Sequence, residues 1–235
     1  MFNFAIQRAI LDQSPIVGIK PPAIERRKDR VLSADEIRVL WTALWDNNPK
    51  IGMNESTRMA ILFQLATACR TNESLGLPWS EIDGDWWTIP AERAKNGNPH
   101  RVPLTPIAKR VLARAKDIGG QMYVFPSPRR AEDGSDRPMV DTAATHAISR
   151  VIRGKQLGKY YLSAQLDMPE FSSHDLRRTA ATHMASIKVP RFVISKILNH
   201  VDRQITAIYD RHNYDDEKLE GLTAWSMLLE KIIQK

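Results

Sequence analysis

The chain has 235 residues, of which 43% are hydrophobic, so it is long enough for a buried core and too apolar for wholesale disorder. Its net charge is +7, from 34 basic and 27 acidic residues scattered along the whole length, which is compatible with a polyanionic partner without establishing one. The single cysteine, Cys69, excludes an internal disulfide, argues against a thiolate zinc site and favours a reducing compartment. Because no apolar run approaches the ~20 residues of a membrane span and the N-terminus lacks a signal-peptide core, we expect a cytoplasmic protein.

The first 30 residues are predicted to form a short helix and a linker. Apolar residues at roughly helical spacing predict a helix over residues 3–12. The stretch that follows, residues 14–30, contains three prolines and a cluster of charges, a composition typical of a linker. Since a lone helix before a linker has nothing to pack on, we interpret residues 1–14 as the last helix of an upstream domain, 15–30 as an interdomain linker and 31–235 as the main domain.

The main domain is predicted to be mostly helical. Ser33 and Glu36 form a capping box ahead of a helix that reaches about Trp45. Further helices are expected at 55–69, 106–115, 140–153, 174–187, 190–198, 203–212 and 215–233, and a helix or a turn is expected at 71–75. Short β-like runs are expected at 79–82, 86–89 and 100–104, separated by turn signals at Asp83-Gly84 and Lys95-Asn96-Gly97. The sequence therefore predicts a mainly α fold with one small three-stranded antiparallel sheet, of α+β class.

His174 and Arg177 lie three residues apart, so they share one face of a predicted helix. Ser172 is a good N-cap with Asp175 three residues further on, which places both side chains in the first turn. Free backbone N–H groups and the helix dipole favour an anion there, and an arginine fork can hold two phosphate oxygens. Taken alone, the pair also fits a solvated helix start with ordinary charges.

Two further cations precede this helix in the chain. Arg70 ends a nearly uncharged helix, where a charge needs a partner or a ligand, and Glu73 could fix its guanidinium. An exposed arginine at a helix end is the alternative. Lys95 is expected at the tip of the second hairpin, from which a long amine can reach a DNA groove or a leaving-group oxygen. A solvated turn lysine is the ordinary alternative.

Two residues near the C-terminus complete the group of polar candidates. His200 follows His174 by 26 residues, and Tyr209 follows His200 by nine. His200 is expected at a helix C-terminus, where a histidine is usually a cap residue favoured by the dipole. Tyr209 lies amid apolar residues and, by itself, fits a core tyrosine.

The order Arg–Lys–His-x-x-Arg–His–Tyr resembles that of the tyrosine recombinase family, the phage-integrase type. The matching segments are ATACRTNESLGLPWSEID, the hairpin with Lys95, HDLRRTAATHM and ILNHVDRQITAIY, with the family's spacings of 26 and nine residues. The resemblance runs from about residue 30 to the C-terminus. The chain departs from the family in having LNH where LGH is commoner and TACRTNE where TGLRRGE is common, and neither departure touches a catalytic side chain.

The resemblance implies a tyrosine recombinase catalytic-domain fold over residues 31–235, with residues 1–14 as the last helix of a truncated core-binding domain. It also implies a site-specific DNA recombinase of the prophage-integrase type, which cuts and rejoins DNA through a 3′-phosphotyrosyl intermediate without a metal, ATP or another cofactor. The catalytic residues carried over are Arg70, Lys95, His174, Arg177, His200 and Tyr209, with Glu73 as a supporting residue.

In this interpretation each side chain has a chemical task. Tyr209 would be the nucleophile, and His174 would help to take its proton because a phenol with a pKa near 10 is a poor nucleophile while protonated. Lys95 would protonate the leaving 5′-oxygen. The phosphate ligands would be Arg70, Arg177 and His200, whose charges and hydrogen bonds stabilise the pentavalent transition state. Of the five tyrosines, Tyr214 is the main competitor, but the acidic run 215–217 beside it would repel a DNA backbone. His183 falls on the opposite face of its helix from His174.

The implied partners are double-stranded DNA attachment sites and further copies of the chain in a tetramer, on DNA of a bacterial or phage nucleoid and not at a membrane. An excisionase or a DNA-bending protein is a candidate accessory partner.

The apolar stripe of Leu219–Ile233 fits a tail that docks on a neighbouring subunit and fits equally well a core helix of its own chain. Three rival functions stay open: a type IB topoisomerase-like enzyme that only nicks and reseals, a catalytically silent DNA-binding protein, and a metal nuclease, against which the lack of clustered carboxylates argues.

Overall fold

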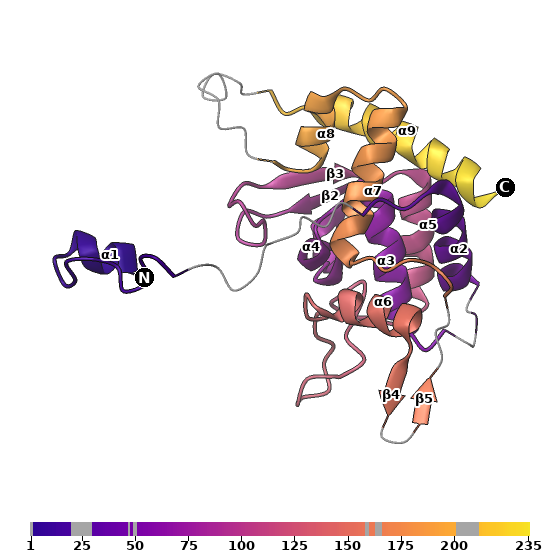
Figure 1. Ribbon diagram of the computed structural model, residues 1–235. Coiled ribbons are helices and arrows are strands. Elements are labelled where there is room, and N and C mark those ends of the chain that lie inside the picture. Colours follow the sequence, from indigo (N-terminus) through magenta and orange to yellow (C-terminus); the bar gives the residue numbers. More distant parts are fainter. Residues whose placement is uncertain are drawn as a thin grey trace.

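The computed structural model describes residues 2–19, 30–46, 48, 51–157, 160–162, 166–200 and 212–235, without the side chains of 155–157 and 160–162. Helix α1 (Phe2–Gln7) has no buried residue and lies apart from the rest of the chain in Figure 1. It is shorter than the helix predicted over residues 3–12. Most of the predicted linker, residues 20–29, lies outside the described residues, so the proposed domain boundaries stay a prediction.

The body of the molecule is built around α3 (Glu55–Thr67), in which every residue after Glu55 is buried. Asn54 caps this helix by accepting a hydrogen bond from the backbone of Thr57 at 2.8 Å. The predicted capping box of Ser33 and Glu36 is present at the start of α2. The helices around α3 are α2 (Ala34–Trp45), α4 (Thr71–Leu75), α5 (Pro106–Lys116), α6 (Ala143–Arg153), α7 (Ser173–Ser186), α8 (Arg191–Ile197) and α9 (Asp215–Ile233).

A three-stranded antiparallel sheet of order β1-β2-β3 lies beside this bundle, as predicted. Its strands are β1 (Ile82–Asp83), β2 (Trp86–Ile89) and β3 (His100–Pro103). Ile89 pairs with His100, so residues 90–99 connect β2 to β3, and Lys95 lies in this connection. The run 79–82 was expected to be a strand, but its first three residues form the 3₁₀ helix η1 (Trp79–Glu81) because the backbone of Glu81 donates to Pro78 O at 3.2 Å.

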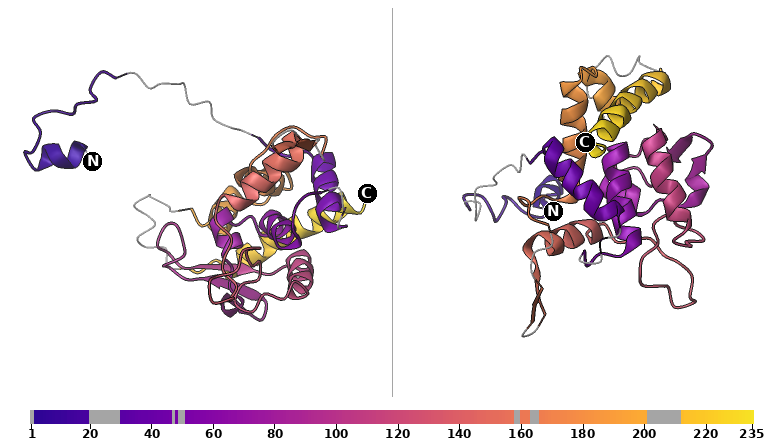
Figure 2. Two further views of the ribbon diagram at one scale, coloured as in Figure 1. Left: turned by 90° about the horizontal axis from the view of Figure 1, so that it is seen from below. Right: turned by 90° about the vertical axis from the view of Figure 1, so that its right-hand side faces the viewer.

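One element of the structure was not predicted, and one predicted helix lies outside the described residues. A second hairpin, β4 (Lys155–Leu157) with β5 (Tyr160–Leu162), follows α6 and was not predicted. It extends away from the helices in Figures 1 and 2. The predicted helix 203–212 falls almost entirely on residues 201–211, which lie outside the described part of the chain.

Helix α9 packs against its own chain, which is the second of the two alternatives predicted for this segment. Leu222, Trp225 and Leu229 are buried, and the indole Nε1 of Trp225 donates to Leu65 O of the central helix at 3.0 Å. Because the structure contains one chain, docking of this helix on a neighbouring subunit stays a prediction. Figure 2 shows α9 lying along the helices α7 and α8. The mainly α fold with one small three-stranded sheet is thus confirmed, and no helix among the described residues is long and apolar enough to cross a membrane.

Candidate active site

The start of α7 places His174 and Arg177 as the sequence predicted. Ser172 is the N-cap. The carboxylate of Asp175 accepts hydrogen bonds from the Ser172 backbone N–H at 2.8 Å and from the Ser172 hydroxyl at 2.7 Å. This capping fixes the first turn of the helix. The His174 side chain is exposed there, whereas Arg177 is only 4% exposed.

Arg177 is held by backbone carbonyls of two distant segments. One guanidinium nitrogen donates to Ala68 O at 2.9 Å, and the other donates to Leu198 O. Ala68 ends α3 with a left-handed conformation, φ 57°, which stops the helix before its predicted end at residue 69. Burial, the largest cause, lowers the pKa of Arg177 to about 10, so the guanidinium is charged at neutral pH.

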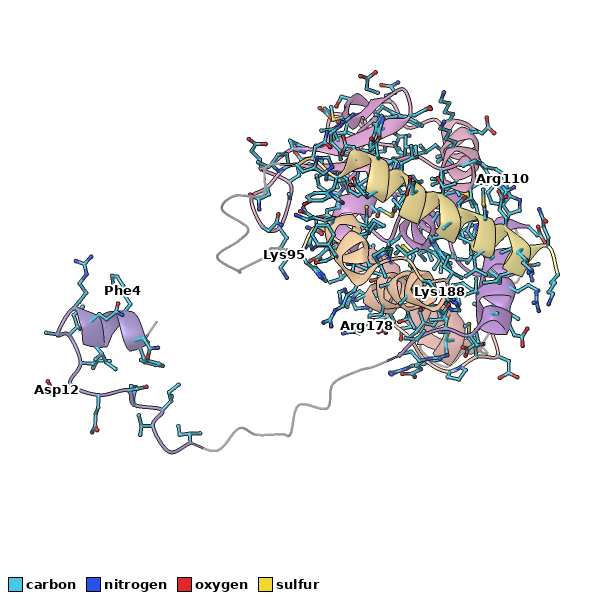
Figure 3. The ribbon with its side chains drawn as sticks, turned by 90° about the horizontal axis from the view of Figure 1, so that it is seen from above. Phe4, Asp12, Lys95, Arg110, Arg178 and Lys188 are labelled. Carbon is cyan, nitrogen blue, oxygen red and sulfur yellow. The ribbon has the colours of Figure 1, made fainter. Side chains whose placement is uncertain are left out.

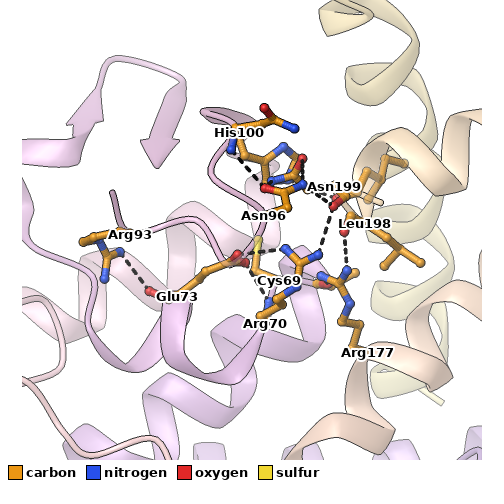
Figure 4. A network of polar contacts seen from close by, with 12 residues as sticks. Cys69, Arg70, Glu73, Arg93, Asn96, His100, Arg177, Leu198 and Asn199 are labelled. Carbon is orange, nitrogen blue, oxygen red and sulfur yellow. Dashed lines mark hydrogen bonds and ion pairs between the residues drawn. The ribbon is translucent and has the colours of Figure 1, made fainter. Parts of the chain in front are cut away.

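Arg70 occupies the N-cap position of α4 and reaches the same region from the other side (Figure 4). Its guanidinium forms an ion pair with the fully buried carboxylate of Glu73 at 2.9 Å, and the other oxygen of that carboxylate accepts from the Arg70 backbone N–H at 3.0 Å. The second guanidinium nitrogen donates to Asn199 O at 2.9 Å. Glu73 thus supports Arg70, as the sequence indicated.

The two arginines therefore meet at consecutive residues. Leu198 O accepts from Arg177, and Asn199 O accepts from Arg70. These carbonyls follow the end of α8, where the last carbonyls of a helix have no partner within the helix and the dipole favours cations. His200 comes next in the chain, so its backbone position is tied to both guanidinium groups.

The conformation of Asn199 accounts for one departure from the family pattern. Its φ is 46°, in the left-handed region that glycine and asparagine adopt most readily. The backbone N–H of His200 then donates back to Ser195 O at 3.0 Å, which closes the end of α8. Asparagine in LNH thus fills the role that glycine would have in LGH.

The β2–β3 connection contacts the same turn. Asn96 Nδ2 donates to Asn199 O at 3.0 Å, and the amide groups of Asn96 and Asn199 contact each other at 3.1 and 3.3 Å. His100 Nε2 lies 3.1 Å from Ile197 O. We call the three carbonyl oxygens of residues 197–199 the carbonyl hub, because donors from β3, α7, the N-cap of α4 and the β2–β3 connection all converge on it.

Burial and neighbouring positive charges act on both candidate histidines. Although His174 is exposed as a residue, its imidazole is partly shielded from solvent. This desolvation, followed by the charges of Arg178, Arg177 and Lys95, lowers the pKa of His174, and Asp175 opposes the shift. Burial, followed by charges that include Arg177, also lowers the pKa of His200. Both imidazoles are therefore favoured in the neutral form at neutral pH, and a neutral His174 can accept a proton.

Lys95 is exposed, and its charge is close enough to act on His174. In Figure 3, Lys95 and Arg178 extend on one side of the molecule and Arg110 lies on the opposite side. The structure thus brings together Arg70, Glu73, Lys95, His174, Arg177 and His200. Tyr209 lies outside the described residues, and its role stays a prediction.

Two residues near this site were not identified from the sequence. Arg93 donates to Glu73 O at 3.1 Å and forms an ion pair with Glu81 at 2.6 Å, so it ties the β2–β3 connection to α4 and η1. No sequence signal pointed to Arg93 beyond its place near Lys95. Cys69 is fully buried between the two arginine anchors, and burial raises the pKa of its thiol to about 12, so it is an inert thiol.

The two competing residues have contacts of their own. The ring of Tyr214 packs edge-on against Phe192 and His212, with centroid distances of 4.8 and 4.5 Å, and Lys196 Nζ lies 4.3 Å from its centroid. These contacts fit a structural role for Tyr214. His183 Nε2 is 2.9 Å from Leu32 O, so this histidine serves the packing of α7, as its place on the opposite face predicted.

Comparison with known sequences matches the part of the chain that contains these residues. A sequence profile of the Phage integrase family matches residues 30–216. The chain is 30% identical over 178 residues to prophage integrase IntA of Escherichia coli K12, a match that covers 74% of this chain and 39% of that protein. It is 23% identical over 203 residues to tyrosine recombinase XerD of Neisseria meningitidis, covering 86% of this chain and 65% of the relative. The chain thus spans less than two thirds of the length of these relatives.

Solved structures show the same fold. A lambda integrase dimer bound to a COC′ core site superposes with a TM-score of 0.59 at 18% identity, covering 90% of this chain and 71% of that one. The XerA recombinase gives a TM-score of 0.53 at 21% identity, covering 92% and 70%. The family match extends over most of the chain and includes the arginines, the histidines and the carbonyl hub. The chain belongs to the phage integrase family.

Proposed function

We propose that this chain is the catalytic part of a site-specific DNA recombinase of the tyrosine type, which cuts and rejoins DNA through a 3′-phosphotyrosyl intermediate. The observation that carries the proposal is the anchoring of Arg70 and Arg177 on the consecutive carbonyls of Leu198 and Asn199, directly before His200. Two guanidinium groups fixed in this way form a preorganised site for one phosphate.

The phosphate ligands in this proposal are Arg70, Arg177 and His200. Because the arginines are held by backbone carbonyls and by Glu73, they need little reorganisation when a phosphate enters. Their charges would offset the negative charge that grows on the non-bridging oxygens. His200 would donate a hydrogen bond to one of these oxygens from its neutral imidazole.

The proton transfers fall to the exposed residues. In the first step the Tyr209 hydroxyl oxygen forms a bond to phosphorus and the bond from phosphorus to the 5′-oxygen breaks. The phenolic proton passes to neutral His174, and Lys95 gives a proton to the departing 5′-oxygen. Attack by the 5′-hydroxyl of another strand reverses these transfers and reseals the backbone, so the bond energy is conserved without ATP.

The proposed substrate is double-stranded DNA that carries an attachment site, in the bacterial cytoplasm, and the proposed assembly is a tetramer. A lambda integrase tetramer bound to a Holliday junction has the same fold, with a TM-score of 0.58 at 16% identity. The proposed tetramer includes exchange of the C-terminal helix between subunits, in which Trp225 and Leu229 would be buried again against a neighbour. Residues 31–235 are the proposed catalytic domain, residues 15–30 connect it to the helix of residues 1–14, and an accessory excisionase or DNA-bending protein is a further proposed partner.

The test uses a pool of duplexes with a fixed nick and randomised sequence on both sides of the phosphate nearest to it. Cleavage there releases a short 5′-hydroxyl fragment that diffuses away, so a covalent protein–DNA adduct accumulates and is seen on a denaturing gel. We expect adducts at one defined sequence, formation in EDTA because the arginines supply the positive charge, and transfer of the bound strand to an added 5′-hydroxyl strand.

Other outcomes would support the rival functions. Adducts spread over unrelated sequences would indicate an enzyme that only relaxes DNA. Cleavage without an adduct, lost in EDTA and restored by magnesium, would indicate a metal nuclease. Binding without cleavage would indicate a silent DNA-binding protein. Each of these results would contradict the proposal.

A further inference from the structure

Asn96 and Asn199 form a reciprocal amide pair between the β2–β3 connection and the carbonyl hub. Asn96 Nδ2 donates to Asn199 Oδ1 at 3.1 Å, and Asn199 Nδ2 donates to Asn96 Oδ1 at 3.3 Å. The same Asn96 nitrogen lies 3.0 Å from Asn199 O. The two residues are 103 positions apart in the sequence, so this pair is a tertiary contact that joins two otherwise separate parts of the site.

The position of the pair links it to catalysis. Asn96 directly follows Lys95, whose side chain is exposed, and Asn199 directly precedes His200. Asn199 O is also the acceptor for Arg70. The connection is long, spanning residues 90–99. Within the described part of the connection and the sheet, the one other hydrogen bond to the carbonyl hub comes from His100 at the start of β3. Without the amide pair, the segment that carries Lys95 would be held to the hub only from that end.

We propose that the Asn96–Asn199 pair is a positioning device that holds Lys95 where it can protonate the 5′-oxygen. This inference rests on the proposed function, because it assigns to Asn96 and Asn199 a role that acts through Lys95. Both are positioning residues and neither contacts the reacting atoms in this assignment. A displacement of about 1 Å can lower a catalytic rate by about 100-fold, so a short polar pair at this place has a measurable effect.

Three variants distinguish the effect of the Asn96–Asn199 side-chain contacts from the effect of the Asn199 backbone carbonyl. Asn96→Ala removes every contact of the pair. Asn199→Gly removes the Asn199 amide but keeps its carbonyl and tolerates its φ of 46°, so Arg70 and one Asn96 contact stay in place. Asn98→Ala is the matched control: Asn98 is exposed in the same connection, and its backbone N–H, which donates to Asn96 Oδ1 at 3.2 Å, is unchanged by the substitution.

The substrates separate a loss of proton donation from a general loss of structure. One nicked duplex has the ordinary 5′-oxygen at the scissile phosphate, and the other has sulfur in its place. A thiolate is a far better leaving group than an alkoxide and leaves without a proton, so cleavage of the sulfur substrate does not need the general acid. Lys95→Ala gives the rate loss expected when the general acid is absent altogether. Arg70→Lys serves for comparison, because weaker phosphate binding should slow cleavage of both substrates.

We expect Asn96→Ala to slow adduct formation on the oxygen substrate by about 10- to 100-fold. This is less than the full contribution of general acid catalysis, about 100- to 10,000-fold, because Lys95 is displaced and not removed. On the sulfur substrate its rate should be within about threefold of the unsubstituted chain, as for Lys95→Ala. Asn199→Gly should show a smaller loss of the same kind. The variant with both substitutions should be no slower than Asn96→Ala, since both act on the same residue pair. Asn98→Ala should cleave normally.

Several results would overturn the inference. Asn96→Ala could be equally slow on both substrates, which would indicate damage to phosphate binding, or it could cleave the oxygen substrate at the normal rate. Equal losses in Asn98→Ala and Asn96→Ala would also overturn it. If Asn96→Ala fails to fold by circular dichroism, Asn199→Gly decides alone: a loss restored by sulfur supports the role, and any other result contradicts it. Failure of the unsubstituted chain to form an adduct on either substrate would instead refute the proposed function, and this inference with it.

Discussion

Acidification should weaken the fold through His100, which is buried beside the carbonyl hub. Burial, followed by the charges of Lys218, Arg177 and Arg70, lowers the pKa of His100 from 6.5 to about 3, while its hydrogen bond with Ile197 O opposes the shift. A histidine that is neutral in the folded state and titrates normally in the unfolded state makes the unfolded chain bind more protons between these two pKa values. Stability should therefore fall as the pH decreases through this window.

The magnitude follows from the two pKa values. At pH 7.5 both states are almost entirely deprotonated at His100, so it contributes almost nothing to the pH dependence. At pH 5.0 the unfolded state is protonated, and the folded state is not. With about 1.4 kcal/mol for each pH unit below the unfolded pKa, the free energy of unfolding should decrease by about 2 kcal/mol from this group.

The assay is urea unfolding followed by tryptophan fluorescence, at pH 7.5 and at pH 5.0, for the unsubstituted chain and for His100→Gln. Glutamine can donate an amide hydrogen bond to the Ile197 carbonyl but cannot be protonated. Carboxylates contribute equally in both proteins, so their effect cancels in the difference. The stability advantage of the unsubstituted chain over the variant should shrink by about 2 kcal/mol between the two pH values. A difference that stays constant would refute the assignment of His100 as a buried neutral donor.

Three further predictions concern packing and the pH dependence of cleavage. Trp225→Ala should lower the free energy of unfolding by about 3–5 kcal/mol, because a fully buried indole and its bond to Leu65 O are lost; a loss below about 1 kcal/mol in urea unfolding would contradict the packing of α9. Gly221→Ala should destabilise by about 1–3 kcal/mol, since a Cβ there would lie 2.9 Å from Ile197 Cδ1, and an unchanged thermal midpoint would show that α8 and α9 can separate. The acid limb of the second-order rate of adduct formation should have its midpoint below pH 6.5, because burial, the largest cause, lowers the pKa of His174; a midpoint above 6.5 would argue against a neutral His174 as the base.

The parts of the site that could be predicted are those with local spacing. His174 and Arg177 are three residues apart on one helix, as are the partners Arg70 and Glu73 around the start of α4, so the chain itself sets their relation. The strands β2 and β3 were likewise predictable, because apolar runs bounded by turn residues mark a hairpin. Local sequence patterns were sufficient wherever the relevant neighbours are close in the chain.

The backbone acceptors of Arg70 and Arg177, at Ala68 and in the carbonyl hub, could not be predicted because these contacts are distant in sequence and involve backbone oxygens. Arg177 reaches Ala68 across 109 residues, and Arg70 reaches Asn199 across 129. The acceptor at Ala68 depends on a left-handed alanine at the end of an apolar helix, for which the sequence has no turn signal. The β4–β5 hairpin was missed because its strands have only three residues each, too few to establish a period.

The most direct test of the account is the identity of the tyrosine that becomes linked to DNA. Trypsin cuts after Arg203, Arg211 and Lys218, so Tyr209 and Tyr214 fall in different peptides. The adduct from the nicked duplex is digested with trypsin and nuclease, and mass spectrometry locates the nucleotide. We predict the nucleotide on the peptide of residues 204–211 and no adduct in Tyr209→Phe. A nucleotide on the peptide of residues 212–218, or an adduct that persists in Tyr209→Phe, would contradict it.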